Sequence, residues 1–171
     1  TIFSNNPLFV DLKQLTTEKW NKILSVATFN EIVENNPNKD TNKTSYSYAT
    51  KQYAIALSEA YNNFIKLNGK KLMAEFDTYK IENDSWLDKD SLYEALSLEH
   101  GTDFWPSWKN AMDKSLFNPK SIEEKIEYSK RIDEISKKYE KEIDEYKFIQ
   151  YVLYKQNLDT KNYADSKGIK M

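Results

Sequence analysis

The chain has 171 residues, a net charge of −2 and 30% charged side chains, which is enough sequence for one domain with a buried core. Its charges are interspersed and Arg131 is the one arginine, which argues against a nucleic-acid partner. No apolar run is long enough to span a bilayer, so we expect no membrane partner. The absence of cysteine excludes disulfides and thiolate chemistry within the chain, and we expect a cytoplasmic location.

Turn residues are scarce, because the sequence contains three glycines and four prolines. This scarcity predicts a mainly α-helical fold rather than an all-β or doubly wound one. Residues 8–12 form the one short apolar stretch that looks extended, and residues 16–24 have the pattern of a short capped helix. A polar loop over residues 34–45 then separates a first segment, 1–45, from a helical subdomain, 46–171.

Within the helical subdomain, apolar residues at three- and four-residue spacing predict helices over about 46–67, 71–81 and 85–100. Gly69 is expected to end the first of these helices, and Gly101 is expected to cap the third. An aromatic turn, residues 104–108, follows.

The most regular pattern lies in residues 120–167, where isoleucines and tyrosines recur with acids and lysines between them. An uninterrupted helix of this length would extend roughly 70 Å. Since that exceeds a small domain, we expect one long C-terminal helix with a bend, a break or a protruding arm. Gly168 is expected to end it, and residues 169–171 have the pattern of a strand that begins there.

The sequence shows no self-contained active site, and we predict no catalytic residue, no metal site and no cofactor. His100 is the one histidine, so an ordinary zinc site is not expected. A position at a helix end beside Gly101 and a role as general base are its two interpretations. The many carboxylates are interpreted as solvated helix faces, because no two of them stand in an apolar context.

The aromatic turn has two interpretations. Trp105 and Trp108 flank Pro106 outside the predicted helices, so their flat faces suit stacking on sugar rings. The alternative is that both side chains fill the core where helices meet.

Several segments, taken in order, resemble the 4-α-glucanotransferases of the amylomaltase (disproportionating enzyme) family. Residues 6–12, N-P-L-F-V-D-L, resemble that family's N-P motif before I-D-L, and S-Y at 45–46 with L-S-E-A-Y at 57–61 resembles D-Y…L-K-E-A-F. W-L-D-K-D-S-L-Y-E-A-L at 86–96 and H-G at 100–101 resemble W-L-E-D-Y-A-L-F-x-A-L…H-G, and the tryptophans of the aromatic turn resemble those that follow. Y-K-F-I-Q-Y-V-L-Y-K-Q at 146–156, Y-A at 163–164 and K-G-I-K at 167–170 resemble H-K-F-x-Q-Y-L-F-F-R-Q…Y-A…R-G-I-K/R.

The resemblance implies a (β/α)₈ barrel with helical insertions, of which this chain would be the insertion region ending at the start of a barrel strand. The family's aspartate nucleophile and glutamate acid/base lie farther along the chain in its barrel. This sequence departs from the pattern at Ser45, Tyr53, Lys89–Asp90 and Asn157, where the family has Asp, Lys, Asp-Tyr and Trp.

These expectations combine into a leading hypothesis. The intact parent is a 4-α-glucanotransferase acting on α-1,4-glucans or maltooligosaccharides, this region walls the glucan cleft, and the region alone is inactive. Asn6, Tyr46, Trp105 and Trp108 are the candidate sugar contacts. A face excised from its barrel would promote homo-oligomers or lower the stability.

Two alternatives come from other classes of protein. In one, the chain is a non-enzymatic interaction module that docks a partner, or itself, through the long helix over residues 120–167. In the other, it is a free-standing sugar-binding helical domain.

Overall fold

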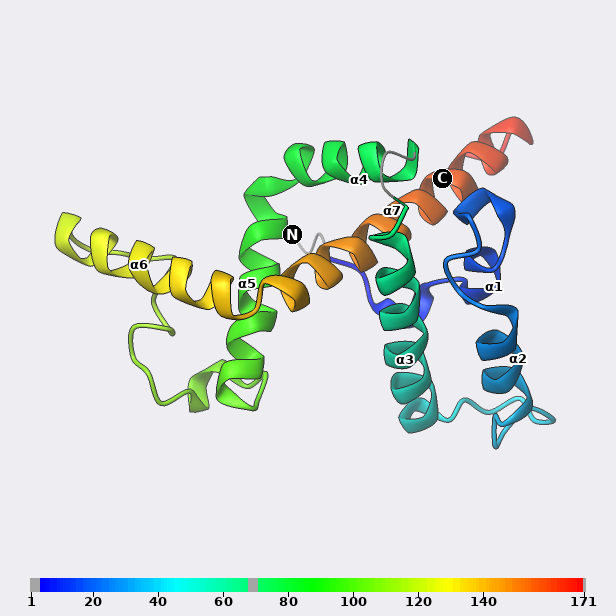
Figure 1. The fold of residues 1–171 in the computed structure, drawn as a ribbon, viewed down its shortest axis with the longest axis horizontal. Helices are drawn as coiled ribbons and strands as arrows, with labels where there is room; N and C mark the ends of the chain where they lie inside the picture. The colour runs from blue at the N-terminus through cyan, green and yellow to red at the C-terminus, as the bar shows by residue number, and fades with distance from the viewer. Residues whose placement is uncertain (1–3, 68–70, 171) are drawn as a thin grey trace. The chain divides into compact units, whose positions relative to one another are not determined.

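A computed structural model describes residues 4–67 and 71–170, and these residues form helices joined by loops (Figure 1). No residue in these two ranges lies in a β-strand, which confirms the mainly α-helical class. None of the described helices is long and apolar enough to cross a membrane. The α-helices in chain order are α1 (Leu12–Leu15), α2 (Val26–Glu34), α3 (Tyr46–Phe64), α4 (Lys71–Glu82), α5 (Asp84–His100), α6 (Ile122–Lys138) and α7 (Glu140–Ser166), with short 3-10 helices η1 (Pro7–Phe9), η2 (Glu18–Trp20) and η3 (Trp105–Ser107).

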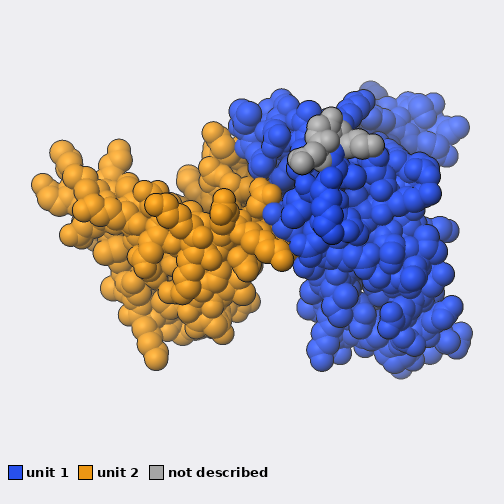
Figure 2. Space-filling view, viewed as in Figure 1, with its two compact units in different colours: residues 1–82, 148–171 blue, residues 83–147 orange. Residues whose placement is uncertain are grey.

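The chain forms two compact units, which are coloured separately in Figure 2. The first unit comprises Thr1–Glu82 and Phe148–Met171, and the second comprises Asn83–Lys147. Helix α7 therefore contributes its first residues to the second unit and the rest to the first. Both segments expected from the sequence, 1–45 and 46–171, supply residues to the first unit.

An aromatic cluster forms the core of the first unit. Phe64 of α3 lies with its ring centroid 4.7 Å from that of Phe148 on α7 and 5.6 Å from that of Phe76 on α4. Tyr151, one helical turn beyond Phe148, lies 5.4 Å from Phe76. All four rings are at most 1% exposed. Since such rings bury large apolar areas, this cluster contributes strongly to the stability of the unit.

The N-terminal residues are helical turns rather than the extended stretch expected over residues 8–12. Polar side chains before each turn cause the difference, because they satisfy backbone N–H groups that have no helical partner. The Asn6 side chain accepts a hydrogen bond from the Leu8 N–H (2.9 Å) and starts η1. The Asp11 carboxylate accepts one from the Lys13 N–H (3.0 Å) and starts α1.

Between residues 16 and 34 the prediction was also partly wrong. The expected helix over 16–24 is reduced to η2, because Asn21 and Lys22 adopt left-handed backbone angles (φ 51° and 54°) that end it. Helix α2, which the sequence analysis did not predict, begins where the Ser25 side chain accepts a hydrogen bond from the Thr28 N–H (3.0 Å). Helix α3 begins at the predicted residue and ends at Phe64, and Gly69, its expected end, lies outside the described residues.

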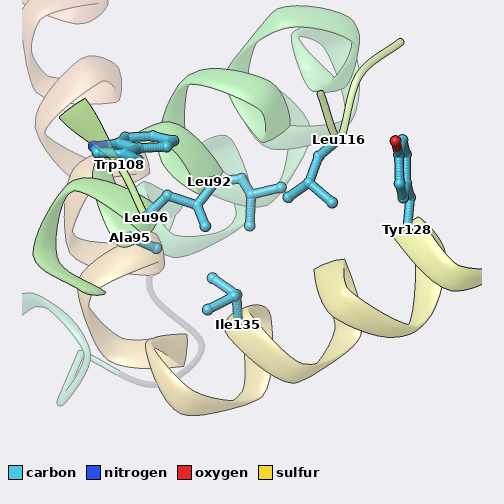
Figure 3. Packing of buried hydrophobic residues seen from close by; sticks show 7 residues of the cluster. All are labelled: Leu92, Ala95, Leu96, Trp108, Leu116, Tyr128 and Ile135. Atoms are coloured by element: carbon cyan, nitrogen blue, oxygen red, sulfur yellow. The ribbon is translucent and has the colours of Figure 1, made fainter. Parts of the chain in front are cut away.

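The second unit has an aliphatic core with two aromatic rings, shown in Figure 3. Leu92 and Leu96 of α5 lie in its middle, and Ile135 of α6 faces them. Trp108 and Tyr128 lie at opposite ends of the cluster in this view. Helix α5 ends as predicted, with Gly101 as a left-handed cap (φ 67°).

The long C-terminal helix is present as α7, 27 residues long, and a break at Tyr139 separates it from α6. The break follows from packing, because Ile135 lies in the core of the second unit whereas Phe148 lies in that of the first. Gly168 ends α7 as expected, with φ 74° and a hydrogen bond from the Ile169 N–H to the Ala164 carbonyl (3.0 Å). Met171 lies outside the described residues, so the strand expected to begin at residue 169 remains a prediction.

Candidate functional site

Two buried glutamines of α7 hold the N-terminal motif in place. The Gln150 side chain accepts a hydrogen bond from the Asn5 N–H (2.8 Å) and donates one to the Asn5 carbonyl (3.0 Å). Gln156 makes the same pair with the backbone of Asp11, at 2.8 and 3.1 Å. The two glutamines are 2% and 6% exposed. Both ends of the stretch 5–11, which carries Asn6, are thereby bonded to α7, and each bond joins residues 145 positions apart in the sequence.

The glutamine amide suits this role because it carries both a donor and an acceptor on one side chain. Each amide therefore satisfies the N–H and the carbonyl of one residue, as a neighbouring β-strand would, without introducing a charge. Both glutamines belong to the motif at 146–156, but no role was predicted for them. A polar residue repeated within a run of apolar helix positions is the signal that could have identified them.

The first two predicted sugar contacts lie on the surface of the first unit. Asn6 is exposed, and its side-chain oxygen is engaged in capping η1. Tyr46, the first residue of α3, is 71% exposed. Phe9, three residues after Asn6, is 77% exposed and was not among the predicted contacts. The unit thus presents one polar and two aromatic side chains from its N-terminal motif and the start of α3.

The aromatic turn of the second unit separates its two tryptophans. Trp105 is 53% exposed, whereas Trp108 is 3% exposed. The Trp108 ring stacks on His100 with a centroid distance of 4.9 Å and an interplanar angle of 9°, and its indole N–H donates to the Thr102 carbonyl (2.9 Å). The burial of Trp108 favours the core interpretation for that residue, and the exposure of Trp105 leaves the sugar-stacking interpretation open.

Further hydrogen bonds fix the turn that carries Trp105. The Trp108 backbone N–H donates to the Trp105 carbonyl (3.1 Å), and the Ser107 hydroxyl donates to the Phe104 carbonyl (2.8 Å). The Lys114 ammonium donates to the carbonyl of Pro106 (2.7 Å). The exposed Trp105 ring is therefore carried by a turn whose backbone is fixed by hydrogen bonds. A fixed turn loses less conformational entropy when a ligand binds.

His100 has a carboxylate partner, whereas the sequence had suggested none. Its Nε2 lies 2.8 Å from Oδ2 of Asp113, and the Arg131 guanidinium donates two hydrogen bonds of 2.9 Å to the same carboxylate. The Asp113 side chain has no exposed surface. Burial raises the pKa of Asp113, but the hydrogen bonds from Arg131 and His100 outweigh it and hold that pKa below its ordinary value of 3.8. Because this network joins α5, α6 and the loop between them, we interpret it as structural.

The two pairs of predicted contacts lie in different units, Asn6 and Tyr46 in the first and Trp105 and Trp108 in the second. No group of three or more His, Asp or Glu side chains in residues 4–67 and 71–170 is placed to hold a metal ion. The exposed candidates among the predicted contacts, Asn6, Tyr46 and Trp105, offer stacking by aromatic rings and hydrogen bonding by a neutral amide.

Comparisons with known proteins identify the family of the chain. The profile of the family described as 4-alpha-glucanotransferase matches residues 1–171. A curated 4-alpha-glucanotransferase of Clostridium butyricum is 24% identical over 169 residues, which is 99% of this chain. The chain spans 30% of the length of that relative.

Proposed function

Since this chain belongs to the 4-alpha-glucanotransferase family, we propose that it is part of an enzyme that transfers segments of an α-1,4-glucan from one sugar to another. The family match over residues 1–171 carries the proposal. Within that enzyme the chain walls one side of the glucan-binding cleft, and its partner is an α-1,4-glucan or a maltooligosaccharide.

The reaction is a retaining transfer in two steps. A carboxylate displaces the leaving sugar from the anomeric carbon and forms a covalent glycosyl-enzyme, while a carboxylic acid protonates the departing oxygen. The 4-hydroxyl of an acceptor sugar then displaces the carboxylate and loses its proton to the same acid/base group. We propose that both carboxyl groups lie outside this chain, so the chain contributes binding and no catalytic residue.

Exposed aromatic and polar side chains perform the binding. Tyr46 and Trp105 each offer a flat apolar face to the C–H face of a glucose ring, and Asn6 offers an amide to a hydroxyl. Trp108 supports the turn under Trp105 through the backbone hydrogen bond between them.

Transfer kinetics test these contacts in the longer protein to which we propose the chain belongs. An aromatic contact contributes about 1 kcal/mol, so Trp105→Ala and Tyr46→Ala should each raise KM for maltotriose about three- to tenfold. Phe117→Ala and Tyr163→Ala are matched controls, because these rings are 49% and 67% exposed in the same two units. An unchanged KM in both test variants would remove the cleft-wall role.

The structure offers less support for an interaction module built on residues 120–167. Ile135, one of the apolar residues that would dock a partner, is fully buried in the core of its own unit. Ile132 and Ile143 pack partly against the same core. Oligomerisation through an apolar face remains a prediction that the molecular mass in solution would test.

A further inference from the structure

A groove in the first unit lies between α4 and α7, and its lining includes none of the four predicted sugar contacts. Its volume is about 440 Å³, and its walls include Glu75, Thr78, Tyr79, Tyr151, Tyr154 and Lys155, a set that we call the α4–α7 groove. Ligand pockets in proteins typically have volumes of about 300–1,000 Å³. The groove is therefore large enough for one or two sugar rings.

One wall of the groove is aromatic. Tyr154 is 45% exposed, and the ring of the buried Tyr79 lies behind it with a centroid distance of 5.1 Å and an interplanar angle of 33°. Tyr79 in turn lies 5.7 Å from Tyr151 in the core. The partly exposed Tyr154 ring therefore packs against a buried ring of the same unit, and aromatic rings exposed in this way can stack on the C–H face of a pyranose.

Polar groups also line the groove. The Lys155 ammonium forms an ion pair with Glu75, and the single Tyr151 hydroxyl proton has two acceptors within reach, Oε2 of Glu75 (3.3 Å) and the Leu72 carbonyl (3.2 Å). The Lys155 hydrogen bond lowers the pKa of Glu75, and burial raises the pKa of Tyr151. A carboxylate accepts hydrogen bonds and an ammonium donates them, which suits sugar hydroxyls.

The charge of the lining selects against ionic ligands. Lys71 and Lys155 supply two positive charges, and Glu75 and Glu82 supply two negative ones, so the formal charges cancel. A phosphate or carboxylate ligand would find no net attraction, whereas a neutral ligand would avoid the cost of desolvating an extra charge.

From this combination of a partly exposed tyrosine ring, a paired carboxylate and ammonium, and zero net charge, we propose that the α4–α7 groove binds a neutral pyranose ring of an oligosaccharide. The assignment of that oligosaccharide as an α-1,4-glucan rests on the proposed function. The groove would be a binding site for the glucan in addition to the contacts at Asn6, Tyr46 and Trp105.

The test is a titration of the ¹⁵N-labelled 171-residue chain with maltoheptaose, followed by NMR chemical shifts. We expect shifts in residues 74–82 and 151–158. Tyr154→Ala should raise the Kd about three- to tenfold through loss of the stacked ring. Tyr163→Ala on the same helix should leave the Kd unchanged, because Tyr163 is exposed and lies outside the groove lining.

A second variant tests the groove without removing a ring. Ala74 is exposed and lines the groove, so Ala74→Trp should obstruct it while leaving the core rings in place. Weaker binding in both variants, with unchanged far-UV circular dichroism, supports the proposal. Shifts confined to other residues, or an unchanged Kd in Ala74→Trp, would overturn it.

Cellohexaose, a β-1,4-linked glucan, separates the two parts of the proposal. Equal affinity for cellohexaose would overturn the α-glucan assignment and keep the sugar site, and binding of neither glucan would overturn the site itself. Transfer activity of the longer protein is measured separately, so a failure of the groove and a failure of the proposed function give different results.

Discussion

In the first unit a cluster of aromatic rings from α3, α4 and α7 forms the core, and two neutral glutamine amides attach the N-terminal motif. The second unit has a smaller aliphatic core, and beside it lies an aspartate without exposed surface, held by Arg131 and His100. Neutral hydrogen bonds and apolar burial change little with pH, whereas a buried ion pair depends on the ionisation of its members. The two units should therefore respond differently to the removal of these polar side chains and to a fall in pH.

The largest effect is expected from Asp113→Ala in the second unit. Removing this carboxylate leaves the Arg131 guanidinium without its buried partner, which costs about 3–5 kcal/mol in the free energy of unfolding. Urea denaturation of the 171-residue chain measures the loss. Asp133→Ala, an exposed aspartate on α6, is the control and should cost less than about 0.5 kcal/mol. Equal effects of the two substitutions would show that the network adds no stability.

Part of the Asp113 contribution should disappear in acid. The folded pKa of Asp113 lies below the ordinary value of 3.8, so the unfolded chain binds a proton first as the pH falls. The stabilisation is fully present above pH about 5 and is lost as the pH falls through the folded pKa. The difference in unfolding free energy between wild type and Asp113→Asn should therefore shrink below pH about 4. A difference that is constant with pH would contradict this account.

A smaller loss is expected from Gln150→Leu in the first unit. Two neutral hydrogen bonds to the Asn5 backbone disappear, and each contributes about 1 kcal/mol, so the cost is about 1–2 kcal/mol and does not vary between pH 4 and 7. Amide hydrogen exchange at Asn5 should accelerate, whereas Asn157→Leu, an exposed position on α7, should leave it unchanged. Unchanged exchange at Asn5 in Gln150→Leu would remove the positioning role of this glutamine.

The smallest effect is expected from the substitution of one glycine in each unit by alanine. Gly101 and Gly168 both cap helices with positive φ angles, 67° and 74°, and an added Cβ would meet no atom within 4 Å at either site. Substitution by alanine should therefore cost about 1 kcal/mol at each, from backbone strain alone. Unequal losses in thermal denaturation would show that the two units differ in how rigidly they hold a helix end.

Apolar periodicity in the sequence correctly predicted the long helices. The prediction was wrong where single side chains decide the local structure. Helices α3, α4, α5 and α7 follow from apolar spacing, and Gly101 and Gly168 end their helices as expected. The turn at η1 and the start of α1 depend instead on the side-chain oxygens of Asn6 and Asp11, which outweigh an apolar pattern that looks extended.

Tertiary contacts explain the remaining differences. The partner of His100 lies in a loop 13 residues away, and the glutamine contacts join residues 145 positions apart, so no local pattern contains them. The α4–α7 groove likewise requires two helices that are distant in sequence to be packed together. Trp105 and Trp108 look equivalent in the sequence, and packing alone makes one exposed and the other buried.

We propose that this chain walls the glucan cleft of a transferase whose catalytic carboxylates lie outside it. Product analysis of maltotriose, incubated in parallel with the longer protein and with the 171-residue chain alone, tests it most directly. We expect glucose and longer maltooligosaccharides from the longer protein and no turnover by the chain alone. Transfer products from the chain alone, or no transfer by the longer protein, would contradict it.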